Sequence, residues 1–276
     1  MSPPRRSVPP IALTIAGSDS GGGAGIQADL RTFHQFGVYG TSVITAITAQ
    51  NTLGVRAIHA VPLHDVRAQL DAVAEDLRPA AFKTGMLATA ELAREVARGI
   101  RAHRLVGFVM DPVMVATTGH RLLDADAESA LLDALLPLAA VVTPNLEEAG
   151  ILTGAPVATV DEMAAAARAL VRLGAGAALV KGGHLDDAAS GTRVVDLLWD
   201  GTAEHRWTRP RVDTRHTHGT GCTLSAAITA GLAHGLPVRE AVARATAFIG
   251  RAIATAPGLG TGRGPVNHFA PPDESD

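Results

Sequence analysis

Short apolar runs alternate with longer amphipathic segments along most of this sequence, and this alternation constrains the fold more than any other feature. It is typical of βαβ units, in which amphipathic helices cover a largely parallel sheet. The sequence therefore predicts an α/β fold. The predicted strands are 11–16, 39–49, 55–60, 81–84, 106–110, 141–143, 177–180, 194–199 and 204–207, and the predicted helices are 24–36, 63–77, 89–103, 126–136, 145–152, 163–173 and 238–253.

Two local patterns refine this prediction. Asp200-Gly201 is a strong turn signal between two predicted strands, so we expect an antiparallel pair at an edge of the sheet. In the last helix, apolar residues recur at intervals of three and four, which indicates one buried face. No internal repeat or low-complexity linker divides the chain. We therefore predict a single domain over residues 11–269, with a disordered tail at 1–10 and a frayed end at 270–276.

Composition narrows the function classes. The 276 residues are 47% hydrophobic, which is enough to bury a sizeable core. A net charge of -3 and only 3% aromatic residues argue against nucleic acid and anionic membrane surfaces as partners. The single cysteine excludes an internal disulfide and fits the cytoplasm. Prolines near the start argue against a signal peptide, and no apolar stretch approaches the roughly 18 residues that would span a bilayer.

Residues 216–225 read His-Thr-His-Gly-Thr-Gly-Cys-Thr-Leu-Ser, a pattern that indicates a loop turning directly into a helix. The free N–H groups at such a helix start stabilise an anion, and glycine lets a phosphate approach the backbone closely. A plain tight turn explains the glycines equally well. Cys222 falls in the first helical turn, where the helix dipole favours its thiolate.

A second glycine-rich stretch, 17–25, follows the first predicted strand. Within it, residues 23–28 satisfy the G-x-G-x-x-A form of a dinucleotide-binding fingerprint. That hypothesis requires an acidic residue at the end of the second strand, where this chain has Gln50-Asn51. We therefore favour a flexible loop over residues 17–23, either a plain connection or a lid over a small ligand.

Polar residues follow several predicted strands, and each has two interpretations. Gln50 either reads a ligand or caps its strand. Asn145 and Glu148 match a capping box, or they approach Mg²⁺ together. Asp111 either approaches the metal or starts a turn with Pro112.

Lys181 could meet a phosphate, although a lysine at a strand end is usually solvated, and we expect Asp29 to be a solvated surface acid. The chain has no P-loop motif. Because the strand ends share one edge of a parallel sheet, these groups and the helix start at Gly219 converge as phosphoryl transfer requires.

An ordered series of motifs extends this interpretation. They are Ala-Gly-Ser-Asp at 16–19, Gly-Gly-Ala-Gly-Ile-Gln-Ala-Asp at 22–29, Val-Ile-Thr-Ala at 43–46, Ala-Gln-Asn-Thr at 49–52, Lys-Thr-Gly-Met-Leu at 83–87, Asp-Pro-Val-Met at 111–114, Thr-Pro-Asn-Leu at 143–146, Lys-Gly-Gly-His at 181–184 and Thr-His-Gly-Thr-Gly-Cys at 217–222. On these motifs the chain resembles the hydroxymethylpyrimidine and phosphomethylpyrimidine kinases of thiamine biosynthesis, in the ribokinase-like superfamily, from about Ile11 to about His268. The resemblance implies a mostly parallel central sheet with helices on both faces and a small antiparallel edge.

The resemblance also implies roles for individual residues. Gln50 reads the aminopyrimidine edge, Ala24, Met86 and Val113 line the ring pocket, and Asp29 belongs to the substrate site. Cys222 replaces the aspartate of the sugar kinases and accepts the proton of the substrate hydroxymethyl group. The remaining roles are the catalytic turn at Gly219 and Gly221, ATP binding by Lys181, Asn145 and Thr220, and Mg²⁺ at Asp111 and Glu148.

The implied activity is the ATP-dependent phosphorylation of the hydroxymethylpyrimidine and then of its monophosphate, by a homodimer acting on small molecules. Two alternatives stay open. A pyridoxal kinase is the nearest, because pyridoxal also carries a hydroxymethyl group on its ring. A pyrimidine-binding sensor without catalysis is the other, although Cys222, Lys181 and Glu148 count against it.

Overall fold

A computed structural model describes residues 8–114, 125–183, 185 and 192–273. Its centre is a nine-stranded sheet in the order β3-β2-β1-β4-β5-β6-β7-β8-β9, so the predicted α/β class and ribokinase-like architecture are confirmed. The strands are β1 (Ile11–Asp19), β2 (Tyr39–Asn51), β3 (Gly54–Ala60), β4 (Ala81–Thr84), β5 (Phe108–Met110), β6 (Val141–Val142), β7 (Ala178–Val180), β8 (Arg193–Trp199) and β9 (Glu204–Pro210).

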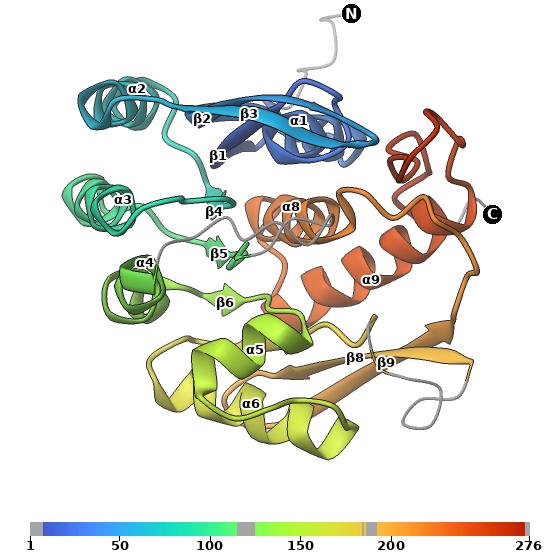
Figure 1. Ribbon diagram of the computed structural model, residues 1–276. Helices are drawn as coiled ribbons and strands as arrows, with labels where there is room; N and C mark the ends of the chain where they lie inside the picture. The colour runs from blue at the N-terminus through green and yellow to red at the C-terminus, as the bar shows by residue number, and fades with distance from the viewer. Residues whose placement is uncertain (1–7, 115–124, 184, 186–191, 274–276) are drawn as a thin grey trace, which may run out of the picture.

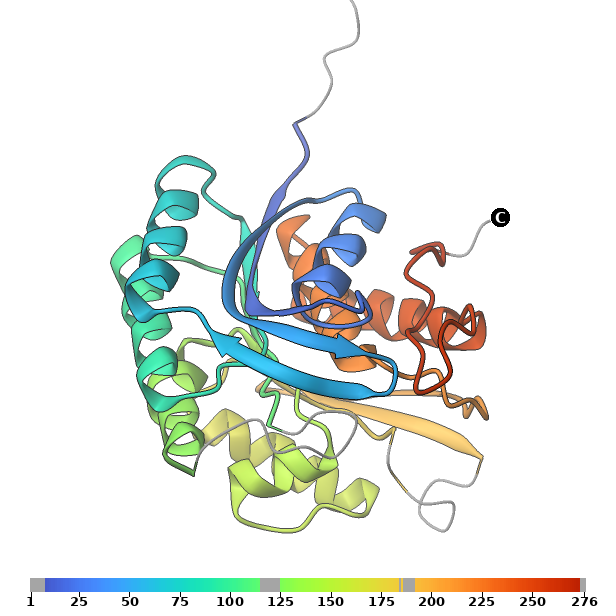
Figure 2. The ribbon, with the colours of Figure 1, turned by 45° about the horizontal axis from the view of Figure 1, so that its top comes forward.

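Helices cover both faces of the sheet (Figure 1). One face packs on α1 (Gly25–Gln35), α8 (Thr220–Ala233) and α9 (Val238–Ala254). The other face packs on α2 (Leu63–Asp76), α3 (Ala90–His103), α4 (Ala125–Ala130), α5 (Leu146–Thr153) and α6 (Val160–Arg172). Successive side chains of a strand point to opposite faces of the sheet, so each face has its own core. Phe82, Phe108 and Met110 belong to one core, and Ala81 and Val109 belong to the other. The tilted view in Figure 2 shows the long β2–β3 ribbon along one side of the sheet.

The sheet is parallel from β2 to β7 and antiparallel at both edges. The predicted hairpin at Asp200-Gly201 joins β8 to β9, where Oδ1 of Asp200 accepts hydrogen bonds from the N–H groups of Thr202 (2.9 Å) and Ala203 (2.7 Å). A second antiparallel edge, β3 against β2, adds to the single edge that we expected.

Several predicted boundaries shift. The loop expected over residues 17–23 is wrong in its first part, because β1 continues to Asp19 alongside Thr48 of β2. The helix expected over 126–136 is α-helical only to Ala130, and it continues as a π-turn (Leu131–Leu135) and a 3₁₀ turn (Leu136–Leu138). Pro137 lacks the N–H that a continued helix would need.

The end that we expected to fray at 270–276 is anchored as far as it is described. Ala270 is buried, and its carbonyl accepts a hydrogen bond from Nε2 of Gln35 (3.0 Å). Arg244 pairs with Asp273 (2.7 Å). Residues 1–7 of the predicted tail and 274–276 lie outside the described residues.

Topology places the polar strand ends together, as predicted. In a parallel sheet the carboxyl ends of the strands share one edge, and here that edge carries Asp19, Gln50, Asp111 and Lys181. The first turn of α8 reaches the same edge, as its contacts with Lys181 show below. No helix within the described ranges is long and apolar enough to cross a membrane.

Candidate functional site

The predicted turn from loop to helix is confirmed at α8. Gly219 is its N-cap and has a φ of +79°, a left-handed conformation that favours glycine. A side chain at Gly219 would also collide with the Gly23 carbonyl, so the loop after β1 packs directly on this turn. Oγ1 of Thr220 donates to the carbonyl of Thr217 (2.7 Å), which fixes the entry to the helix. Among the described residues no side chain caps this helix start. The N–H of Thr220 donates to the Thr217 carbonyl (3.2 Å), and the N–H groups that follow it remain suited to an anion.

Lys181, Asp111 and Glu148 form a cluster beside this turn, which we call the open cluster. Nζ of Lys181 lies 3.2 Å from Oδ1 of Asp111 and 3.8 Å from Oε2 of Glu148. The Lys181 side chain is only 14% exposed, so the solvated interpretation is wrong. A β-carbon at Gly221 would lie 3.4 Å from Nζ of Lys181, which shows how closely the cluster meets the helix start.

The cluster holds two carboxylates against one ammonium. Burial raises the pKa of Glu148 to about 7, and the neighbouring charge of Asp111 adds to this rise against the pull of Lys181. Burial opposes the charge of Lys181, but Asp111 and Glu148 outweigh it and raise the lysine's pKa. Oγ of Ser225 donates to Oδ2 of Asp111 (3.1 Å), a contact that the sequence did not reveal. The surplus negative charge suits a bound cation.

Asn145 and Glu148 form the capping box that one interpretation predicted. Oδ1 of Asn145 accepts from the Glu148 N–H (2.9 Å), and Oε2 of Glu148 accepts from the Asn145 N–H (2.8 Å). The same Glu148 oxygen faces Lys181, so capping and membership of the open cluster coexist. ATP binding by Asn145 and Thr220 stays a prediction.

The surface interpretation of Asp29 is wrong. Asp29 and Lys83 are both fully buried, and Nζ of Lys83 lies 2.8 Å from Oδ1 of Asp29. Oγ1 of Thr14 donates to Oδ2 (2.6 Å), so both carboxylate oxygens are engaged inside the protein. Burial acts to lower the pKa of Lys83, but the Asp29 carboxylate outweighs it and raises that pKa. We call Lys83 and Asp29 the sealed pair; a lysine inside a buried strand was the signal that could have revealed it.

Cys222, in the first turn of α8, is partly exposed and interacts with both groups of charges. Its thiol accepts a hydrogen bond from the N–H of Gly25, and it interacts electrostatically with Lys83 and Lys181. We expected the helix start to favour the thiolate, but burial raises the pKa of Cys222 to about 11, against the opposing charge of Lys83. The free protein therefore holds a protonated thiol at neutral pH.

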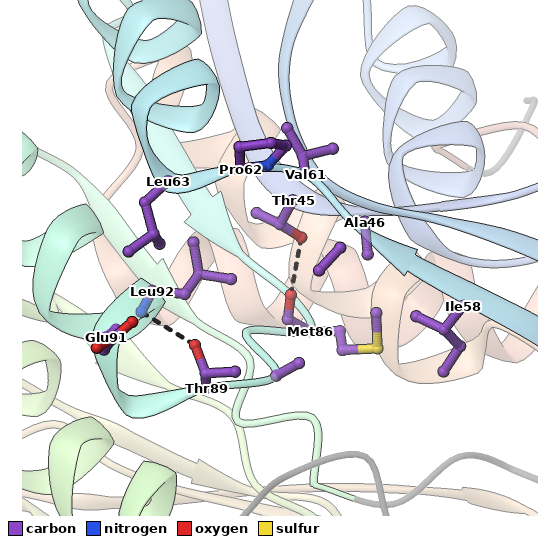
Figure 3. A pocket seen from close by; sticks show the side chains of 12 residues that line it. Thr45, Ala46, Ile58, Val61, Pro62, Leu63, Met86, Thr89, Glu91 and Leu92 are labelled. Carbon is purple, nitrogen blue, oxygen red and sulfur yellow. Dashed lines mark hydrogen bonds between the residues drawn. The ribbon is translucent and has the colours of Figure 1, made fainter.

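The other predicted substrate residues are all partly exposed. The N–H of Ala24 donates to Oδ2 of Asp19 (2.9 Å), and the N–H of Val113 donates to the Asp111 carbonyl (2.9 Å). Met86 lines a cavity of about 200 Å³ between β2, β3 and α3, and its carbonyl accepts from Oγ1 of Thr45 (3.1 Å; Figure 3). Gln50, Ala24 and Val113 do not line this cavity. The substrate roles of these residues stay predictions.

Two residues near Gln50 received no role from the sequence, although both lie in the matched motifs. Oδ2 of Asp19 lies 2.9 Å from Nε2 of His218, and the same ring nitrogen lies 3.3 Å from the amide nitrogen of Gln50. Burial acts to raise the pKa of Asp19, but His218 and backbone N–H groups hold it below its usual value. These contacts join the loop after β1 to the turn before α8.

A magnesium ion would have to share the open cluster with ligands from a nucleotide. Within the described part of the chain, no group of three or more His, Cys, Asp or Glu side chains is arranged to hold a metal. Mg²⁺ is commonly bound through one or two carboxylates, with water and phosphate oxygens completing its shell. Asp111 and Glu148, with their surplus charge, fit that mode.

Comparison with known proteins agrees with this geometry. The family model for phosphomethylpyrimidine kinase matches residues 19–267. The hydroxymethylpyrimidine/phosphomethylpyrimidine kinase of Rhizobium meliloti (strain 1021) is 56% identical over 262 residues, which cover 94% of this chain and 97% of that protein. The ADP complex of Bacillus subtilis pyridoxal kinase superposes with a TM-score of 0.88 at 40% identity, covering 95% of this chain and 98% of that one.

A solved phosphomethylpyrimidine kinase from Clostridium difficile 630 superposes with a TM-score of 0.77 at 42% identity, covering 87% of this chain and 97% of that one. Its name agrees with that of the relative from Rhizobium meliloti. With its ribokinase-like fold and its match over residues 19–267, the chain belongs to the phosphomethylpyrimidine kinase family.

Proposed function

We infer that this protein transfers the γ-phosphoryl group of ATP to 4-amino-5-hydroxymethyl-2-methylpyrimidine, and then phosphorylates the monophosphate to the diphosphate, in thiamine diphosphate biosynthesis. One observation carries the inference: Lys181, Asp111 and Glu148 lie beside the helix start at Gly219 to Cys222, which no described side chain caps. Phosphoryl transfer requires this combination of an anion site, a cation and carboxylates.

The chain's own groups supply most of the chemistry. The N–H groups at the start of α8 and the Lys181 ammonium stabilise negative charge on the transferring phosphoryl group. Asp111 and Glu148 would hold Mg²⁺, which would neutralise phosphate charge when bound. The missing side chain at Gly221 leaves room beside Lys181 for a phosphate to reach the backbone, whereas the missing side chain at Gly219 makes room for the Gly23 carbonyl.

Cys222 accepts the proton that the substrate hydroxyl group loses in the first reaction. As the hydroxymethyl oxygen bonds to the γ-phosphorus and the bond to ADP breaks, the hydroxyl proton passes to the sulfur of a Cys222 thiolate. Lys83 and Lys181 stabilise that thiolate, while burial limits its fraction at neutral pH. The second phosphorylation rests on the activity named for the relative from Rhizobium meliloti.

Pyridoxal kinase is the second candidate, because a pyridoxal kinase shares this fold at 40% identity. ATP consumption by the purified protein with Mg²⁺ separates the candidates, using the hydroxymethylpyrimidine, its monophosphate and pyridoxal in separate reactions. We expect turnover on both pyrimidines. Turnover on pyridoxal alone would contradict the pyrimidine assignment.

The family resemblance further leads us to propose a homodimer in the cytoplasm. Sedimentation velocity of the purified protein tests the dimer. A species of twice the 28.3 kDa chain mass is expected, and a monomer at micromolar concentration would contradict it.

A further inference from the structure

One ring atom of His218 serves two partners beside the predicted substrate site. Its Nε2 lies 2.9 Å from Oδ2 of Asp19 and 3.3 Å from the side-chain amide of Gln50. The His218 side chain is only 13% exposed and that of Asp19 only 4%, so water competes little for the hydrogen bond between them. The protonation of this one nitrogen therefore decides both contacts.

Asp19 makes the ring nitrogen a donor. Its Oδ2 accepts from the N–H groups of Gly23 (3.0 Å) and Ala24 (2.9 Å), and its Oδ1 accepts from that of Gly21 (2.8 Å). A carboxylate surrounded by backbone donors is ionised and can only accept hydrogen bonds. Nε2 of His218 therefore carries a hydrogen and donates it to Asp19.

The donor role of His218 fixes the orientation of Gln50. The structure places the amide nitrogen of Gln50 toward this Nε2–H, which would oppose donor to donor. The two ends of an amide are told apart by their hydrogen bonds, so we assign the carbonyl oxygen to this end, with the amide turned by a half-rotation. The other end, which is Oε1 in the structure and becomes the NH₂ group after this rotation, lies 3.3 Å from Oγ1 of Thr48. That hydroxyl donates its own proton to the Ser18 carbonyl (2.9 Å), so it accepts from the amide NH₂. Both ends of the amide agree on one orientation.

We propose that His218 is a positioning residue, which holds the Gln50 amide in one orientation and thereby makes the site select an aminopyrimidine over the corresponding pyrimidinone. The proposal rests on the proposed function, in which Gln50 hydrogen-bonds the ring edge. A 4-aminopyrimidine presents an N–H donor next to a ring-nitrogen acceptor. A 4-oxo ring presents the reverse, an acceptor next to an N–H donor.

If the Gln50 amide is held in one orientation, it matches only one of these two patterns. An amide that can rotate by half a turn matches either. The ring cannot compensate by turning. Its hydroxymethyl group must still point toward the phosphoryl group, and rotation about the axis through ring atoms C2 and C5 would carry the amino edge away from Gln50. Discrimination between the two rings therefore depends on the contacts that hold the amide.

The test compares kcat/KM for 4-amino-5-hydroxymethyl-2-methylpyrimidine with that for its 4-oxo analogue. In wild-type protein we expect a strong preference for the amino ring. His218→Leu removes the donor, and we expect the preference to fall by about tenfold or more, mainly through KM. His218→Gln is the matched control: its amide places an N–H near the position of Nε2 and should keep most of the preference.

Thr48→Val removes the contact at the other end of the amide without touching His218, so it decides the question even if His218→Leu fails to fold. We expect it to lower the preference as well, and Thr48→Ser, which retains the hydroxyl, to keep it. An unchanged amino-to-oxo ratio in the folded His218→Leu and Thr48→Val variants would overturn the proposal while leaving the proposed function intact. Failure of wild-type protein to phosphorylate the aminopyrimidine would instead overturn the proposed function, and this proposal with it.

Discussion

The sealed pair and the open cluster each oppose a lysine to carboxylates beside Cys222, yet they differ in exposure and in charge balance. Lys83 and Asp29 are fully buried, one ammonium against one carboxylate. Lys181 is 14% exposed and faces two carboxylates, Asp111 and Glu148. The sealed pair balances one positive charge against one negative charge. In the open cluster the Asp111 and Glu148 side chains are only 2% and 5% exposed, but they outnumber the single ammonium, and Lys181 keeps the access that a phosphate would need.

The two lysines therefore have different roles, and their burial accounts for the difference. Lys83 is a buried cation that pairs with Asp29 and acts electrostatically on Cys222. Lys181 keeps 14% exposure, so a phosphate oxygen can approach it, although its partners Asp111 (2%) and Glu148 (5%) are buried.

The largest effect is expected on stability at the sealed pair. Lys83→Met leaves Asp29 as an uncompensated buried charge, and we expect a loss of about 3–5 kcal/mol in the free energy of unfolding. Urea unfolding measures it, with Lys181→Met as the matched variant at the more accessible lysine. Adding Asp29→Leu to Lys83→Met should recover part of the loss. Equal losses at the two lysines would break the contrast.

The next effect concerns Cys222, which interacts with both lysines. If its thiolate accepts the hydroxyl proton, Cys222→Ala should lower kcat by roughly 10²–10⁴-fold. Because burial raises the pKa of Cys222 to about 11, the wild-type rate should climb with pH throughout the neutral and alkaline range. Cys222→Asp, whose carboxylate ionises at lower pH, should flatten that climb. Near wild-type turnover of Cys222→Ala, together with an unchanged pH profile for Cys222→Asp, would remove the proton-acceptor role.

Because Glu148 is the second carboxylate beside a single ammonium, we expect the stability of the protein to depend on pH. The pKa of Glu148 rises from 4.5 to about 7 on folding, so the folded state holds its proton more tightly than the unfolded state does. This contribution to stability is complete below pH 4.5 and is lost as the pH rises through 7, a change of about 3 kcal/mol. Comparing wild-type protein with Glu148→Gln by thermal unfolding, without Mg²⁺, isolates it. If the difference in stability between the two proteins stays constant from pH 4.5 to 8, the pKa of Glu148 is not raised in the folded state.

Much of the fold could be predicted because it depends on periodicity. The alternation of strands and helices, the hairpin at Asp200-Gly201 and the apolar face of α9 all follow from local patterns. The continuation of β1 to Asp19 could not be foreseen, because glycine and serine suit a loop while pairing with β2 makes a strand.

The site could be predicted only in part, because its contacts cross long sequence separations. The carboxyl ends of parallel strands share one edge of the sheet, and this placed Lys181 and Asp111 together. It could not show that Lys181 contacts two carboxylates. The sequence pattern left Asp29 on the surface, since its partner Lys83 lies 54 residues away. Burial at Cys222 likewise reversed the expected pKa, because desolvation depends on tertiary packing.

The most direct test of the contrast measures nucleotide affinity. Isothermal titration with Mg²⁺ and a non-hydrolysable ATP analogue compares wild-type protein, Lys181→Met and the double variant that replaces Lys83 with Met and Asp29 with Leu. We expect Lys181→Met to weaken binding by about 10- to 100-fold, because a charge-assisted hydrogen bond to phosphate is lost, and the folded double variant to bind as wild type does. Unchanged affinity in Lys181→Met, or an equal loss in the double variant, would contradict the assignment of the phosphate site to the open cluster.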